Sequence, residues 1–87
     1  MTDFDNHDLL FETLLNLKTI EDYRLFFTDL CTPKELDSMV QRITAAKMLI
    51  SGKNYEQITS ETDISSATLA RISRCVKYGK GYKTLLK

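Results

Sequence analysis

The segment from Tyr55 to Arg74, YEQITSETDISSATLARISR, most constrains how this 87-residue chain can fold. Its apolar positions predict two short helices joined by a tight turn, with Ile58 facing inward from the first helix and Ile64 filling the turn. Leu69 and Ile72 would form the apolar seam of the second helix, because residues three apart share a helix face. This layout is typical of a helix-turn-helix, which places its second helix in the major groove of DNA.

The outward face of that second helix would carry small, polar or cationic side chains, which suit a close approach to base edges and phosphates. We expect the reading surface to comprise Ser65, Ser66, Thr68, Ala70 and Arg71, with Arg71 reaching a guanine edge. Phosphates would be bound at the start of the motif and beyond the reading residues, by Lys53, Asn54, Tyr55, Arg74 and Lys77.

An ordinary helical hairpin with a solvated polar face is the alternative to this motif. Thr59 stands where a small Ala is usual in a helix-turn-helix, and Asp63 stands where Gly often allows the sharp turn. Asp can adopt the left-handed conformation at moderate cost, so Asp63 remains compatible with the turn.

The net charge of zero conceals a division along the chain. Residues 1–40 hold three basic and nine acidic groups, a net of −6, whereas residues 41–87 hold nine basic and three acidic groups, a net of +6. A cationic half beside an anionic half indicates a nucleic-acid surface on one side only. Chance segregation is the alternative, but the basic half also contains the helix-turn-helix pattern.

Length and composition predict a single all-α domain, residues 1–87, with no strand pattern. No apolar stretch is long enough to span a membrane, and the acidic N-terminus MTDFDNHD is unlike a secretory signal. We therefore expect a cytoplasmic protein in which Cys31 and Cys75 stay reduced. The lone His7 is expected at a helix start or in solvent, and no catalytic set or metal site can be picked out, so an enzyme is not expected.

Capping signals predict where most of the helices begin. Asn6 would cap a helix over 7–17, and Thr19 with Asp22 would cap one over 20–30. Thr32, followed by Pro at the first helical position and Glu35, would begin a long helix that continues to residue 50.

Further signals organise the second half of the chain. Gly52 would end the long helix, Asn54 with Gln57 would cap the first motif helix, and Ser65 would cap the second. Gly79 and Gly81 would then mark a stop. The expected organisation is dimerisation helices over 7–50, the helix-turn-helix over 53–78 and the start of a C-terminal helix over 79–87.

The first thirty residues are apolar on more than one side of each predicted helix, and such helices are buried on most sides. A protomer of 87 residues is too small to enclose both, so we expect a two-fold homodimer. Two copies of the motif would then read two half-sites about 34 Å apart. The alternative is a surface that binds another protein. The apolar residues are Leu9, Leu10, Phe11, Leu14, Leu15, Leu17, Ile20, Tyr23, Leu25, Phe26, Phe27 and Leu30.

Several of these features together resemble the Trp repressor family, and most closely its short Trp-repressor-related members in Gram-positive bacteria. The resemblance covers residues 7–82 and rests on Thr32-Pro33 opening a long helix, on Arg42, on LISG ending at Gly52 and on LARISR from Leu69 to Arg74. It implies an all-α fold of five to six helices in an intertwined homodimer, with a helix-turn-helix on each flank. It also implies operator binding and transcriptional repression.

The resemblance further implies a tryptophan pocket between the long helix and the recognition helix, comprising Thr32, Arg42, Arg74 and Cys75. Cys75 replaces a glycine and would intrude on the ligand, and Arg71 replaces a threonine and could fill the ligand's place. The alternative to a tryptophan-like co-repressor is therefore no ligand at all. Arg42 would then either extend its charged group to solvent or pair with an acid such as Asp37 or Glu35, and Arg74 would contact a phosphate. We expect no cofactor.

These patterns predict a sequence-specific DNA-binding transcriptional regulator, a repressor, that acts as a homodimer on double-stranded DNA. The alternative is a helical dimeric protein-interaction module whose helix-turn-helix is vestigial.

Overall fold

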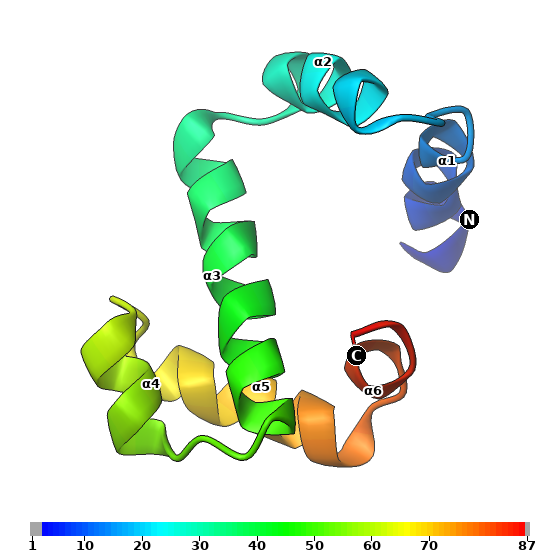
Figure 1. Ribbon diagram of the computed structural model, residues 1–87. Helices are drawn as coiled ribbons and strands as arrows, with labels where there is room; N and C mark the ends of the chain where they lie inside the picture. Colours follow the sequence, from blue (N-terminus) through cyan, green and yellow to red (C-terminus); the bar gives the residue numbers. More distant parts are fainter. Residues whose placement is uncertain (1–2, 87) are drawn as a thin grey trace. The chain divides into compact units, whose positions relative to one another are not determined.

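A computed structural model describes residues 3–86, and all the regular secondary structure in this range is α-helix (Figure 1). The predicted all-α class is therefore confirmed. In chain order the helices are α1 (Asp3–Leu14), α2 (Ile20–Leu30), α3 (Pro33–Ile50), α4 (Tyr55–Glu61), α5 (Ser66–Tyr78) and α6 (Gly81–Leu85). Within this range, no helix is long and apolar enough to cross a membrane.

The chain divides into two units, one ending at Pro33 and one from Lys34 onward. From Lys34 onward, the long helix α3 therefore belongs to the same unit as α4, α5 and α6. The last residue of the predicted C-terminal segment, Lys87, lies outside the described range.

The predicted start of the first helix is wrong. Asn6 lies inside α1, which spans Asp3–Leu14, because no Gly or Pro precedes Asn6 to stop the helix there. The predicted end is wrong as well. The N–H groups of Asn16 and Leu17 donate to carbonyls three residues back, at 3.1 Å each, so the chain leaves the α-helix in a tighter turn.

The predicted start of α2 is confirmed by a capping box. The backbone N–H of Asp22 donates to Oγ1 of Thr19 at 3.1 Å, and the N–H of Thr19 donates to Oδ2 of Asp22 at 3.3 Å. The N–H of Lys18, which donates to the same carboxylate at 3.0 Å, is the main cause that lowers the pKa of Asp22. This stabilisation is present at neutral pH and is lost as the pH falls through the lowered pKa.

The α3 helix begins at Pro33 and ends at Ile50, as predicted. Gly52 follows with φ of 97°, a left-handed conformation that no other described residue adopts. The backbone N–H of Lys53 donates to the carbonyl of Met48 at 3.0 Å, which closes the end of the helix. The backbone direction into α4 is therefore fixed by a position that favours glycine.

The core of the second unit forms where α3, α4 and α5 meet. Ile58 and Leu69 are fully buried, and Ile64 and Ile72 are 7% and 3% exposed, so the four predicted inward positions are confirmed. Two small α3 residues allow close approach, because a methyl group leaves room for neighbouring side chains. These are Ala45 and Ala46, which are also fully buried.

Candidate nucleic-acid interface

Hydrogen bonds at both helix starts hold the helix-turn-helix in place. At the start of α4, Oδ1 of Asn54 accepts from the N–H of Gln57 at 2.9 Å, and Oε1 of Gln57 accepts from the N–H of Asn54 at 3.0 Å. At the start of α5, Oγ of Ser65 accepts from the N–H of Thr68 at 3.2 Å. Each bond satisfies a donor that the first turn of a helix leaves unpaired.

The turn between α4 and α5 does not use a left-handed residue. No described residue other than glycine has a positive φ, so the left-handed conformation considered for Asp63 is not adopted. Instead Thr62 is extended, and its hydroxyl donates to the carbonyl of Ile58 at 2.8 Å while Ile64 enters the core. The sharp turn therefore needs no glycine.

The recognition helix α5 has a buried face and an outward face. Leu69, Ile72 and Ser73 are buried, whereas Arg71 and Arg74 are exposed three residues apart. Neither guanidinium has an ion pair or hydrogen bond with the described residues. Both charges are therefore available to an external anion.

The other predicted reading residues differ in the exposure and the hydrogen bonding of their side chains. Ser66 and Ala70 are exposed, but Thr68 is half-buried. Ser65 is exposed, yet its hydroxyl caps α5 and donates to Oγ1 of Thr68 at 3.0 Å. Among the predicted reading residues, Ser66, Ala70 and Arg71 are therefore the ones whose side chains make no hydrogen bond or ion pair with the described residues.

The predicted phosphate-binding residues lie at both ends of the motif. Lys53 and Asn54 precede α4, Tyr55 opens it with 44% exposure, and Lys77 is exposed in the last turn of α5. Lys53 is already paired, since its Nζ lies 3.2 Å from Oε2 of Glu61. The Oδ1 atom of Asn54 is used in capping, which leaves its amide N–H groups as donors.

A cavity of about 300 Å³ lies between α3, α5 and α6 within the second unit. Arg42 and Cys75 line it, as predicted for the effector pocket, but the second arginine in its lining is Arg71 and not Arg74. Thr32 belongs to the other unit. The remaining lining residues are Thr68, Ile72 and Tyr82.

Two features of this cavity were not predicted. The ion pair of Arg42 with Asp37 or Glu35, one of the alternatives to ligand binding, is not formed, since Arg42 makes no ion pair with the part of the chain that the structure describes. Tyr82, which the sequence analysis missed, closes one side of the cavity from α6. Its only sequence signal is an aromatic residue directly after the helix-starting Gly81.

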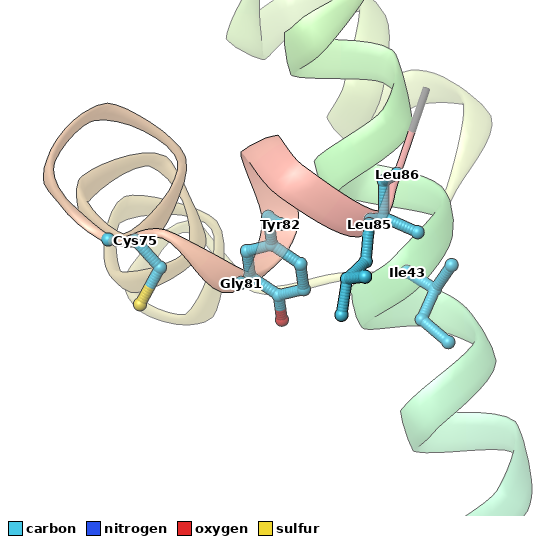
Figure 2. Close-up of a pocket in the computed structure, with 7 residues that line it drawn as sticks. Ile43, Cys75, Gly81, Tyr82, Leu85 and Leu86 are labelled. Carbon is cyan, nitrogen blue, oxygen red and sulfur yellow. The ribbon is translucent and has the colours of Figure 1, made fainter.

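A second cavity, of about 530 Å³, is almost entirely apolar (Figure 2). Figure 2 shows Ile43 of α3 facing Tyr82 and Leu85 of α6, with Cys75 of α5 at the other end. Leu85 is 80% exposed and Ile43 is 44% exposed. The second unit therefore presents an open apolar surface beside its core.

The first unit also presents uncovered apolar side chains. None of the residues of α2 is buried, although Tyr23 stacks on Phe27 with ring centroids 6.3 Å apart. Large apolar side chains remain exposed on both helices and beside them: Leu9 at 72%, Leu15 at 81%, Ile20 at 71% and Leu25 at 64%. Large apolar side chains left exposed in this number are typical of a surface that another molecule covers.

The motif and its unpaired cationic side chains define a protein of the helix-turn-helix class. A family model described as Trp repressor protein matches residues 5–87. The chain belongs to the Trp repressor family, which is a family of DNA-binding regulators and not of enzymes. The resemblance stated from the sequence is thus confirmed.

The chain is also similar to particular members of the family. It is 46% identical over 72 residues to the uncharacterized protein YerC of Bacillus subtilis (strain 168), covering 83% of this chain and 69% of that protein. A TrpR-like protein from Eubacterium eligens ATCC 27750 superposes with a TM-score of 0.81 at 39% identity, over 87% of this chain and 79% of the other. A proposed Trp repressor from Staphylococcus aureus gives 0.85 at 37% identity, over 94% and 83%.

Proposed function

We propose that the protein is a homodimeric transcriptional repressor of the bacterial cytoplasm that binds specific sites in double-stranded DNA. The observation that carries this proposal is the outward pair Arg71 and Arg74 on α5. Their helix is anchored by the buried Leu69 and Ile72, so the two charges are held on a rigid element. Arg71 reads a base edge, and Arg74 binds a phosphate.

The homodimer is supported by the apolar side chains that the protomer leaves uncovered. Leu9, Leu15, Ile20 and Leu25 are 64–81% exposed, and the apolar cavity lined by Ile43 and Leu85 adds a further surface. A second copy of the chain offers matching apolar surface without requiring another gene product. In this arrangement two recognition helices face one duplex.

We also propose that DNA binding needs no amino-acid co-repressor. The thiol of Cys75 stands in the wall of the cavity that Arg42 and Arg71 line, so the space is narrower than it would be with a glycine at that position. Titration calorimetry with tryptophan tests this point: no heat is expected, and duplex affinity should be equal with and without tryptophan. Saturable binding of tryptophan that tightens duplex binding would contradict it.

The function is tested by fluorescence anisotropy of a labelled duplex with the purified protein across a range of salt concentrations. Binding should weaken steeply with salt, because each phosphate contact adds about 0.9 to the slope of log affinity against log salt. A protein-interaction module with zero net charge would show little retention on duplex or heparin. Absence of salt-dependent binding would therefore favour that alternative.

A further inference from the structure

We infer that Glu61 is a positioning residue that limits DNA affinity by holding the side chain of Lys53 away from phosphate. The inference rests on the proposed function and concerns a contact within the helix-turn-helix. The Nζ atom of Lys53 donates to Oε2 of Glu61 at 3.2 Å, from the loop before α4 to the last residue of that helix.

The backbone of Lys53 is held in place, so its ammonium group can pair either with the Glu61 carboxylate or with a DNA phosphate, but not fully with both. Its N–H donates to the carbonyl of Met48 at 3.0 Å, directly after the left-handed Gly52. Because the backbone is held at the entrance to α4, the ammonium group can reach either the Glu61 carboxylate or an external phosphate beside that helix start. An ammonium paired with a carboxylate contributes little net charge to phosphate binding.

The place of Glu61 argues against a purely structural role. It is the last residue of α4, where the negative end of the helix dipole disfavours a carboxylate. The two side chains of the pair are 42% and 54% exposed, and pairs this exposed add little to folding stability. The carboxylate therefore contributes little to the fold while it neutralises a cation at the proposed interface.

The test compares wild type with Glu61→Gln, Lys53→Gln and the double variant on a random-sequence duplex, from about 50 to 200 mM salt. Glu61→Gln should bind about two- to fivefold more tightly, as expected from releasing an exposed ion pair. Its salt slope should steepen by up to about 0.9, the contribution of one more phosphate contact. In the Lys53→Gln background the same change should give no such gain.

Glu56→Gln is the matched control, because Glu56 is an exposed carboxylate on the same helix without an ion pair among the described residues. Equal gains for Glu56→Gln and Glu61→Gln would overturn the inference, since the effect would then be one of net charge alone. Weaker binding by Glu61→Gln, or an undiminished gain without Lys53, would overturn it as well. If wild type binds no duplex, both the inference and the proposed function fail; if only the Glu61 effect is absent, the proposed function stands.

Discussion

Arg71 is the residue at which the proposed reading surface meets the cavity beside it. It is exposed on the outward face of α5, and it also lines the cavity that Arg42 and Tyr82 line. The sequence comparison had assigned this second arginine position to Arg74. Counting along a motif could not place Arg71 beside Arg42 in this cavity, because the register between α3 and α5 is set by their packing through Ala45 and Ala46.

Arg71→Ala should cost about 1–3 kcal/mol of binding to the operator and relax the preference at one base pair, because a bidentate contact to guanine carries that much discrimination. The measurement is anisotropy on a selected operator and on random duplex. Lys77→Ala serves as the comparison. It should weaken binding to both duplexes alike and reduce the slope of log affinity against log salt concentration by about 0.9. If Arg71→Ala lowered the affinity for both duplexes equally, Arg71 would not be a base-reading residue.

The start of a helix could be predicted from the sequence where its capping residues lie close together along the chain. The Thr19 and Asp22 box, the Asn54 and Gln57 box and the Ser65 cap each lie within four residues, and each forms the expected hydrogen bond. The start of α1 was not predictable from Asn6, because a capping residue stabilises a start by only about 1 kcal/mol and cannot stop a helix that continues past it. Tyr82 was missed because a five-residue helix has too few residues to show a period.

Gly79 and Gly81 should respond in opposite ways to substitution by alanine. A Cβ at Gly79 would lie 2.6 Å from the backbone oxygen of Cys75, so Gly79→Ala should lower the free energy of unfolding by about 1–3 kcal/mol. Gly81 begins α6 in open space, so Gly81→Ala should be neutral or stabilising by about 0.4–1 kcal/mol. Urea unfolding at one protein concentration measures the free energy of unfolding of both variants. Equal changes for the two variants would show that the close approach of Gly79 to the Cys75 carbonyl does not limit which residue can stand there.

The whole molecule combines an acidic first half with a basic second half. All-α architecture followed from the periodicity and capping signals, because these depend on neighbouring residues. The oligomeric state could not be predicted from such local signals. Apolar residues on every side of a helix indicate that another surface covers the helix, but they do not show which molecule provides that surface. The apolar side chains left uncovered on α1, α2 and α6 are the physical basis for the proposed homodimer.

Leu25→Glu should dissociate the proposed dimer. Leu25 is 64% exposed on α2, so the change removes no contact from the protomer's own core. Burying a leucine contributes about 1.5–3 kcal/mol, so the dimer dissociation constant should rise by more than about tenfold. Sedimentation velocity measures this, with the exposed polar Thr28→Glu on the same helix as the control. Unchanged dimerisation of Leu25→Glu would exclude this surface of α2 from the interface.

In the proposed complex, two copies of the chain present a pair of recognition helices to one DNA duplex. The most direct test is native mass spectrometry of the protein with a selected operator duplex. We predict a complex of two protomers with one duplex that forms without added amino acid. A complex of one protomer per duplex, or free protein beside free duplex at low salt, would rule out a homodimer that binds DNA through two recognition helices.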